Sequence, residues 1–461
     1  MAGRAGGAGR AGNSDAVSTA ELRELDALHV WHPFTPHSAY ADDNPLMVVA
    51  GAGHYLIDAD GRRYFDGVSS LWCNLFGHRR PEIDQAIREQ LDRIGHATFL
   101  GNATAPAVTL AKRLVDKAPA GLSRVFYSDN GSTAVEVALK MALQYWQQAD
   151  GGAQKQRTAF LTFGSAYHGD TIGSVSLGGI DLFHERYRPL LFQTIQAPSP
   201  AASGALQALE ALVHTHGSTL AAIVLEPGMQ GAAGMVTQPA GFTKRVRELA
   251  NRAGALLILD EVAVGFGRSG ELFASTKEGV APDFLCLAKG LTGGYLPMAA
   301  TLTTERVFRA FLGHPSEGRT FFHGHTYTGN PLAAAAAHAT LDIFEQTDLL
   351  AELPGKVARL AVLLDDLRVL PAVGDIRQYG LAAGIELFSD RDSRRSYPAQ
   401  ERRGMKVCGA ARRHGVFLRP LGDVVVLMPP LTVTDEELSM LVRVLHDSIA
   451  EVCGAPVAVP A

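Results

Sequence analysis

Short apolar runs alternate with amphipathic segments through the middle of the chain. The runs 220–225, 255–259 and 284–288 are apolar at every position, which is typical of strands buried on both faces of a sheet. The segments between them place apolar residues at helical spacing. This order predicts an α/β fold with a mostly parallel sheet, covered by helices on both faces, over residues 80–344.

The first part of the chain has a different pattern. Residues 21–79 begin with a short helix and continue with strand-like alternation around Asp60 and Gly61, a pair typical of a hairpin turn. We assign this segment to a smaller domain. Residues 1–20, rich in Gly, Ala and Arg and without an apolar core, are expected to be a disordered tail.

The last part of the chain is expected to complete the smaller domain. An alanine-rich helix is predicted at 331–344, where the large domain ends. Strand-like runs follow at 380–387 and 424–430. Residues 345–461 are therefore predicted to form the C-terminal, α+β part of the small domain.

Two predicted strand ends carry side chains of opposite charge. The run 255–259 leads into Asp260, and the run 284–288 leads into Lys289, which is followed by glycines. Because ligands of parallel α/β sheets collect at the carboxyl ends of strands, we expect the carboxylate and the amine to meet. A desolvated lysine can bind an aldehyde and move a proton, and a buried carboxylate can hold the proton of a ring nitrogen. These are the two protein groups that pyridoxal phosphate needs, so Lys289 and Asp260 are candidate catalytic residues.

A third strand end predicts an anion site. Residues 125–127 resemble a strand, 128–132 a turn, and 134–146 a helix with apolar residues at helical spacing. The free backbone amides and the dipole at the start of this helix favour an anion such as a phosphate group. The same turn is also typical of an ordinary helix cap.

Composition narrows the class of partner. The chain has 461 residues, 47% of them hydrophobic, a formal charge of −5 and a pI near 6.3, so it lacks the basic surface of a nucleic-acid-binding protein. No apolar run reaches the length of a membrane span. A small-molecule substrate is therefore expected. The cysteines are widely spaced without a CxxC pair, which favours reduced thiols and a cytoplasmic location: Cys73, Cys286, Cys408 and Cys453. We expect no metal site at His323 and His325, since no third ligand lies at suitable spacing.

The candidate residues lie in motifs of one family. These motifs are EPGMQG at 226–231, LDEVAVGFGR at 259–268 and AKGLTGGY at 288–295. Together they resemble the class III, ornithine-transaminase-like group of pyridoxal-phosphate aminotransferases. The resemblance implies a fold-type-I transferase, pyridoxal 5'-phosphate as cofactor and a homodimer with shared active sites. Ornithine-type members carry Gln where this chain has Ala263, which disfavours ornithine as the substrate.

A narrower resemblance is to the members of this family that convert 8-amino-7-oxononanoate to 7,8-diaminononanoate in biotin biosynthesis. It rests on WHPF at 31–34, SSLW at 69–72, YSDNGS at 127–132, YHGDT at 167–171 and LRP at 418–420. The resemblance implies that Tyr167 stacks on the cofactor ring and takes part in catalysis. The implied cofactor-binding residues are Gly131, Ser132, Tyr167, Asp260, Lys289, His325 and Thr326, with Thr326 reaching the phosphate bound by the other subunit. The implied substrate-binding residues are Phe34, Trp72, Tyr167, Gly324 and Arg419.

The sequence leaves two amino donors open. Most members of the narrower group use S-adenosylmethionine, whose adenosyl and sulfonium groups need aromatic side chains to stack on. This chain has Leu71 where many members have a second tryptophan, and Phe34 where they have tyrosine, a pattern similar to that of relatives that take lysine. We expect S-adenosylmethionine as the amino donor. The alternatives are lysine as the donor for the same acceptor, or another class III omega-aminotransferase reaction.

Two other classes of protein share single features with the chain. Residues 265–270 fit G-x-G-x-x-G after a strand, but no acidic residue follows at the distance that a dinucleotide-binding fold requires. A pyridoxal-phosphate-binding regulator would need a DNA-binding module, and the N-terminal segment has no helix-turn-helix pattern. An enzyme acting on small amines agrees better with the sequence than either.

Overall fold

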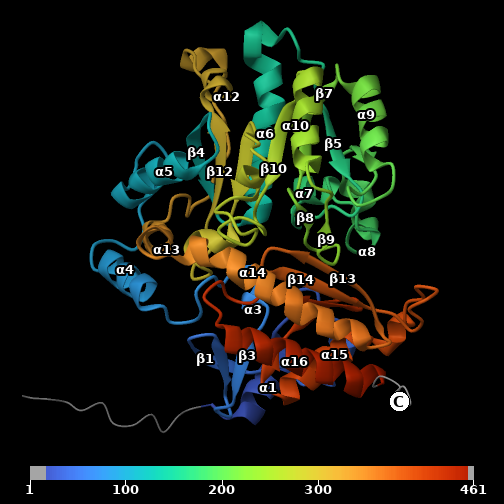
Figure 1. Cartoon of the computed structure of the whole chain (residues 1–461). Coiled ribbons are helices and arrows are strands. Elements are labelled where there is room, and N and C mark those ends of the chain that lie inside the picture. Colours follow the sequence, from blue (N-terminus) through green and yellow to red (C-terminus); the bar gives the residue numbers. More distant parts are fainter. Residues whose placement is uncertain (1–16, 455–461) are drawn as a thin grey trace, which may run out of the picture.

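The computed structural model describes residues 17–454, and its larger part is built on a seven-stranded sheet (Figure 1). The strands follow the order β4-β12-β11-β10-β7-β5-β6. In that order their bounds are Leu122–Ser128, Ala299–Thr304, Phe284–Leu287, Leu256–Asp260, Leu220–Leu225, Ala159–Phe163 and Ile195–Ala197. β12 is antiparallel to β4 and β11, and the pairings from β11 to β6 are parallel. The predicted mostly parallel sheet is confirmed.

Alternate residues of the central strands pack against helices on opposite faces of this sheet. In β10, Leu257 and Leu259 join the core that includes α9 (Ala205–His216) and α10 (Phe242–Ala253). Their neighbours Leu256 and Ile258 join the core that includes α6 (Gly131–Gln148). All four side chains are fully buried. The uninterrupted apolar run therefore reflects a strand with no solvent-facing side.

Two four-stranded sheets lie below the large sheet in Figure 1. One has the order β1-β2-β3-β15, and β15 pairs in parallel with β3. The other has the order β13-β14-β17-β16. The bounds are β1 Val48–Ala52, β2 Tyr55–Asp58, β3 Arg63–Asp66, β13 Val373–Tyr379, β14 Ala382–Leu387, β15 Val416–Phe417, β16 Arg419–Leu421 and β17 Val424–Leu427. The parallel pairing of β3 with β15 joins segments from the two ends of the chain.

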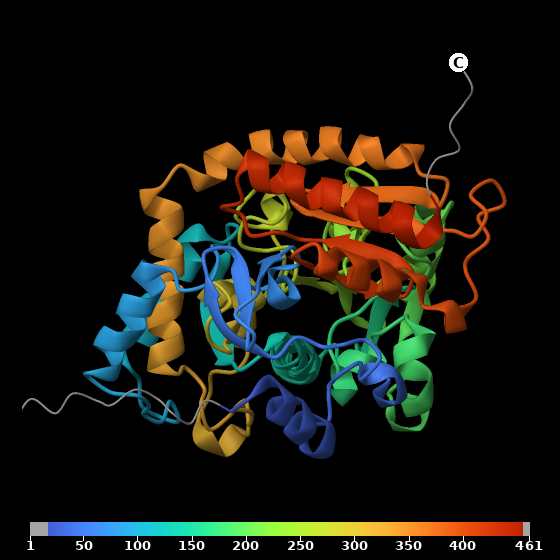
Figure 2. The same ribbon diagram turned by 90° about the horizontal axis from the view of Figure 1, so that it is seen from below.

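Long helices cover these smaller sheets. Figure 2 shows α16 (Asp435–Cys453) lying between α14 (Leu349–Asp365) and α15 (Arg403–Arg413). The remaining α-helices within the described residues are α1 Thr19–His29, α2 His37–Tyr40, α3 Ser69–Trp72, α4 Pro81–Leu91, α5 Ala105–Lys117, α7 Ile172–Ser176, α8 Asp181–His184, α11 Ala274–Lys277, α12 Glu305–Arg309 and α13 Pro331–Gln346. A two-stranded sheet pairs β8 (Met229–Gln230) with β9 (Val236–Thr237).

Most elements expected from the hydrophobic pattern are present. The hairpin at Asp60 joins β2 to β3, and the predicted helix at 331–344 is α13. β12 was not predicted, because threonines interrupt its apolar residues. The hydroxyls of Thr301 and Thr303 donate to the backbone carbonyls of Ala134 and Asp283, so they are buried at little cost.

The expected tail, 1–20, is only partly covered by the structure. Residues 1–16 lie outside the described residues. The first helix begins at Thr19, two residues inside the segment expected to be disordered, and the Ser18 hydroxyl accepts the Glu21 amide at its start.

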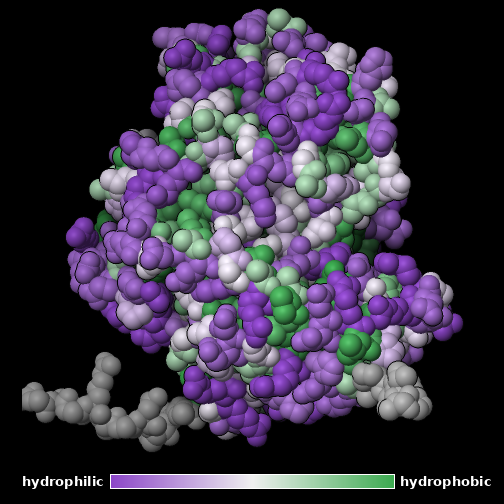
Figure 3. Space-filling view, in the orientation of Figure 1, coloured by the Kyte–Doolittle hydropathy of each residue, from purple (hydrophilic) through white to green (hydrophobic). Residues whose placement is uncertain are grey.

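Polar residues cover most of the face seen in Figure 3. Within residues 17–454, no helix combines the length and the apolar character needed to cross a membrane.

Candidate functional site

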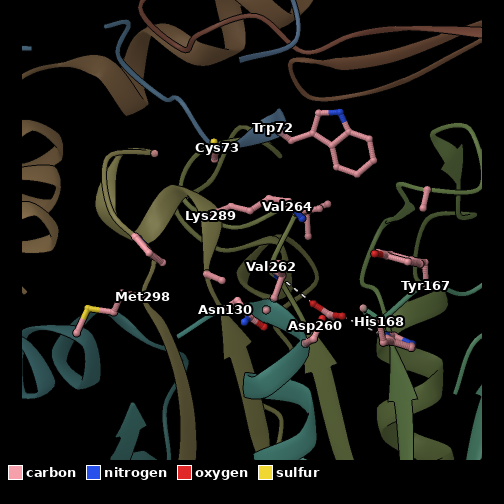
Figure 4. A pocket seen from close by; sticks show the side chains of 18 of the residues that line it. Trp72, Cys73, Asn130, Tyr167, His168, Asp260, Val262, Val264, Lys289 and Met298 are labelled. Atoms are coloured by element: carbon pink, nitrogen blue, oxygen red, sulfur yellow. Dashed lines mark hydrogen bonds and ion pairs between the residues drawn. The ribbon is translucent and has the colours of Figure 1, made fainter. Parts of the chain in front are cut away.

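A cavity of about 430 Å³ lies at the carboxyl ends of the central strands (Figure 4). Four neighbouring strands each contribute a residue at or just after their carboxyl end. These are Lys289 after β11, Asp260 at the end of β10, Glu226 after β7, and Tyr167 after β5. The turn after β4 adds residues 129–132. The strand ends therefore bring together the three groups of residues that the sequence indicated.

Lys289 begins a short 3-10 helix, Lys289–Thr292, with a left-handed φ of 41°. Its Nζ lies 5.3 Å from the centre of a Trp72 ring and makes no hydrogen bond or ion pair within the described residues. Burial lowers the pKa of Lys289 from its ordinary value, although the charge of Asp260 opposes this. A lowered pKa increases the fraction of neutral amine, which is the form that binds an aldehyde or accepts a proton.

Asp260 is held in place by two hydrogen bonds. Its Oδ1 accepts the backbone amide of Val262 at 3.0 Å, and its Oδ2 lies 2.8 Å from Nδ1 of His168. Burial acts to lower the pKa of His168, but the hydrogen bond to Asp260 and the charges of Asp260 and Glu226 together raise it. The imidazole therefore donates to Asp260, which orients the carboxyl group toward the cavity (Figure 4).

The start of α6 forms a second side of the cavity, next to the end of β10. The Asn130 side chain caps this helix by accepting the Thr133 amide, which leaves the amides of Gly131 and Ser132 free for a ligand. A Cβ at Gly131 would lie 2.6 Å from Val262 Cγ1. Only glycine therefore allows the helix to begin this close to the β10 strand end.

Tyr167 lines a third side of the cavity. Its hydroxyl donates to Asp170 Oδ2 at 2.8 Å, and its backbone amide donates to Glu226 Oε1 at 3.1 Å. The ring of His184 lies almost parallel to it, with 6.4 Å between ring centres and 11° between planes. Burial, and then the hydrogen bond to Asp170, raise the pKa of Tyr167, so its hydroxyl stays protonated.

Sequence reasoning missed the roles of two buried residues here, His168 and Glu226. Both lie inside recognised motifs, but a single histidine or glutamate in a loop carries no pattern that marks it as part of a site. Glu226 accepts the amides of Tyr167 and Gly231, so it joins two walls of the cavity. Burial is the main reason that its pKa rises to about 7.

Comparison with known proteins agrees with this geometry. Residues 38–449 match the family model described as aminotransferase class-III. This chain belongs to the class III aminotransferases. The match spans most of the chain, including every strand of the large sheet.

Several class III aminotransferases are close relatives. The adenosylmethionine-8-amino-7-oxononanoate aminotransferase of Nitratidesulfovibrio vulgaris is 54% identical, over 92% of this chain and 81% of that protein. The crystal structure of the Methanocaldococcus jannaschii protein of the same name is 42% identical, with a TM-score of 0.91 over 94% of this chain and 99% of that one. A PLP-bound amine transaminase from an uncultivated Pseudomonas species is 37% identical, with a TM-score of 0.85, over 92% of this chain and 99% of that one.

Class III aminotransferases use pyridoxal 5'-phosphate, and the residues of this cavity fit it. Lys289 offers an amine of lowered pKa, Asp260 a buried carboxylate, and Gly131 and Ser132 free amides at a helix start. When bound, the cofactor supplies an electron sink that stabilises negative charge on the substrate carbon. Within the described residues, no cluster of three or more His, Cys, Asp or Glu could hold a metal ion.

The other expected site residues do not line this cavity. Gly324, His325 and Thr326 lie in the segment after β12, where Nδ1 of His325 is 3.8 Å from Asp129 Oδ2. Arg419 is exposed on β16. Phe34 reaches the site only indirectly, because its ring contacts Phe183, whose ring contacts Tyr167. Of the expected substrate-binding residues, this chain places only Trp72 and Tyr167 at the cavity.

A methyl group at Gly131 is expected to weaken cofactor binding. In Gly131→Ala the new Cβ would collide with Val262, and the start of α6 would shift. Loss of one charge-assisted hydrogen bond makes binding roughly tenfold to a hundredfold weaker. Titration of the apoenzyme with pyridoxal phosphate measures this. Gly409→Ala is the matched control, since a Cβ there meets nothing within 4 Å; an equal loss in both variants would contradict the explanation.

Glu226 is expected to make stability depend on pH. Its carboxyl has an ordinary pKa of 4.5 when unfolded and about 7 when folded. Below the unfolded value both states are protonated and its stabilising contribution is complete; as the pH rises through the folded value this contribution is lost. The free energy of unfolding of the wild-type apoenzyme, relative to Glu226→Gln, should fall by about 3 kcal/mol over this interval. The measurement is urea unfolding of both proteins at several pH values. If the free energies of unfolding of wild type and Glu226→Gln changed with pH in parallel, the prediction would be contradicted.

Proposed function

We propose that this class III aminotransferase converts 8-amino-7-oxononanoate to 7,8-diaminononanoate, a step of biotin biosynthesis, with S-adenosylmethionine as the amino donor. The carrying observation is the 54% identity, over 92% of the chain, to a protein named for this reaction. The cavity supports the proposal, because it combines the lysine and carboxylate of an aminotransferase with a largely apolar wall. That wall includes Trp72, Met229, Val264 and Met298. An apolar wall suits an acceptor whose amino and oxo groups lie at the end of a long hydrocarbon chain.

Each residue at the cavity has a distinct part in the transfer. Lys289 Nζ would anchor the cofactor and would accept and return a proton at the reacting carbon of the substrate. Asp260, oriented by His168, holds a proton on the ring nitrogen of the cofactor. Tyr167, which lines the cavity, would cover the cofactor ring and exclude water, and the amides of Gly131 and Ser132 would hold the phosphate.

The amino donor can be tested separately from the acceptor. Holoenzyme is mixed with S-adenosylmethionine or with lysine, without any acceptor, and conversion of the bound cofactor to its amine form is followed by absorbance. We expect conversion by S-adenosylmethionine. Conversion by lysine alone would replace the donor and leave the acceptor in place. Formation of 7,8-diaminononanoate on adding 8-amino-7-oxononanoate tests the acceptor.

Arg419 is proposed to bind the carboxylate of the acceptor. Within residues 17–454 its side chain makes no hydrogen bond or ion pair, so its guanidinium is available to a ligand. A charge-assisted hydrogen bond contributes roughly 1.5–3 kcal/mol. Arg419→Ala is therefore expected to raise KM for the acceptor roughly tenfold to a hundredfold and to spare its methyl ester. Equal losses for acid and ester would assign Arg419 a structural part instead.

We also propose a homodimer whose subunits complete each other's active sites. Trp31 is 90% exposed and Phe322 is 82% exposed, and a second copy that covered them would bring Thr326 to its neighbour's phosphate site. Mixed assembly tests this. Dimers that combine Lys289→Ala and Thr326→Ala subunits have one site with both changes and one with neither, so they should regain activity that neither parent has.

Two further assignments stay proposals. We propose that residues 21–79 and 345–461 form one small domain beside the large domain, 80–344, consistent with the pairing of β3 with β15. We propose a cytoplasmic location because all four cysteines are free thiols. Limited proteolysis and cell fractionation test the two assignments.

A further inference from the structure

The turn that carries Trp72, residues 69–72, has an unusual backbone; it is the segment labelled α3, and Ser70 and Leu71 inside it are not helical. Ser69, Ser70 and Trp72 have positive φ values of 49°, 61° and 65°. Ser70, with ψ of −75°, has the conformation of the rare and strained γ-turn. Residues other than glycine keep such conformations only where surrounding groups impose them. The turn must therefore be held from outside.

Asp66 holds the turn from one side. It is fully buried at the end of β3. Its Oδ1 accepts the Ser70 amide at 2.7 Å, and its Oδ2 accepts the Ser70 hydroxyl at 2.9 Å. The same Oδ2 lies 3.0 Å from Nε2 of His78, which fixes the orientation of the carboxylate. Both hydrogen-bond donors of Ser70, the most strained residue, thus bind one side chain.

Arg268 holds the turn from the other side. It is 1% exposed, and its Nη2 donates to the Ser69 hydroxyl at 2.9 Å and to the Asn74 carbonyl at 3.4 Å. Its Nη1 donates to the Pro429 carbonyl. Within the described residues no carboxylate pairs with Arg268, and burial lowers its pKa to about 10. Burying a guanidinium without a counterion is costly. We therefore interpret Arg268 as a residue that holds the turn in position through its hydrogen bonds.

The position of the indole depends on this turn. The Trp72 side chain makes no hydrogen bond within residues 17–454, so only packing and its backbone place it. A Cβ at Gly231 would lie 3.2 Å from Trp72 Cζ3, and a Cβ at Gly294 would lie 2.7 Å from the carbonyl carbon of Cys73. The indole thus fits a narrow space beside Lys289 (Figure 4), and relaxation of the turn would displace it.

We propose that Asp66 and Arg268 are positioning residues for acceptor recognition, which hold the strained turn so that the Trp72 indole packs against the apolar chain of the substrate. Neither residue lines the cavity. The inference rests on the proposed function for the identity of the acceptor. What it adds to the proposed function is that residues which do not touch the substrate contribute part of the substrate affinity.

A double-mutant cycle tests this on the holoenzyme. Asp66→Asn is expected to raise KM for 8-amino-7-oxononanoate roughly tenfold, with kcat changed less than about twofold, because the reacting groups stay in place. In a Trp72→Ala background the same change should leave KM unaltered, since the indole through which Asp66 acts is gone. If Asp66→Asn raised KM by the same factor with Trp72 present and with Trp72→Ala, the inference would be overturned.

The matched control is Asp58→Asn. Asp58 is also a buried aspartate at the end of a strand in the same sheet, where it accepts the amides of Asp60 and Arg62 and the Tyr64 hydroxyl. It does not contact the turn, so its variant should lose stability without a rise in KM. An equal rise in KM for both aspartate variants would show a general structural effect and overturn the inference.

A milder variant keeps the inference testable if Asp66→Asn does not fold. Ser70→Ala removes only the hydroxyl that binds Asp66 and should raise KM in the same direction by a smaller factor, again only when Trp72 is present. If wild-type enzyme fails to aminate 8-amino-7-oxononanoate, the proposed function is wrong. The double-mutant cycle is then measured with the acceptor that the wild type does use. An equal rise in KM from Asp66→Asn with and without Trp72 would still overturn the inference.

Discussion

Replacing Lys289 with alanine is expected to abolish turnover while the protein folds as before. The variant loses both the amine that anchors the cofactor and the group that moves the proton at the reacting carbon. General base catalysis alone contributes roughly a hundredfold to ten-thousandfold, so activity should fall at least about a thousandfold. Steady-state rates, with the thermal unfolding midpoint as the measure of folding, check this.

Lys277→Ala is the matched control for this prediction. Lys277 is a lysine of α11 whose Nζ donates to the Ser269 carbonyl at 3.1 Å and lies 5.0 Å from the Tyr379 ring centre. It lies outside the cavity, so its removal tests the loss of a lysine as such. Near wild-type turnover in Lys289→Ala, or an equal loss in Lys277→Ala, would contradict the assignment of Lys289.

Asp260→Asn is expected to have the second-largest effect. The amide is almost the same size as the carboxylate but carries no charge, so it cannot hold a proton on the ring nitrogen of the cofactor. It also faces a His168 ring that now lacks its anionic partner. Loss of one such electrostatic group lowers kcat roughly a hundredfold to a thousandfold. The measurement is kcat at saturating donor and acceptor, together with the affinity for pyridoxal phosphate.

Asp283→Asn provides the comparison. Asp283 is another buried aspartate, which precedes β11 and so lies at the opposite edge of the same sheet, where it binds Arg247 and Arg306. Its substitution should lower the free energy of unfolding and leave kcat unchanged. If Asp260→Asn instead behaved like Asp283→Asn, with lower stability and normal kcat, Asp260 would be structural.

That Lys289 and Asp260 line one cavity could be predicted, because both lie at the carboxyl ends of buried strands. A continuous apolar run identifies such a strand, and parallel strands deliver the residues after them to one edge of the sheet. The position of Gly131 and Ser132 followed from the same argument, applied to β4 and α6. Burial lowers the pKa of Lys289, which is the direction that the part proposed for it in catalysis requires.

Residues that act through other residues could not be found in this way. Asp66 and Ser70 are close in sequence, yet only the folded turn shows that one carboxylate accepts both the amide and the hydroxyl of Ser70. Arg268 and Ser69 are 199 positions apart in the sequence, and no periodicity relates them. The raised pKa of Glu226 likewise comes from burial between two loops, a property that the chain acquires only on folding.

The sequence by itself determined the class of fold, the strand ends that carry the chemistry, and the family, because hydrophobic period and local motifs depend on neighbouring residues. The tertiary structure decided which of the expected residues meet. It placed Trp72 and Tyr167 at the cavity of the same chain, and left Phe34, Gly324 and Arg419 outside it. It also showed how a strained turn is held, since hydrogen bonds between distant segments form only when folding has brought those segments together.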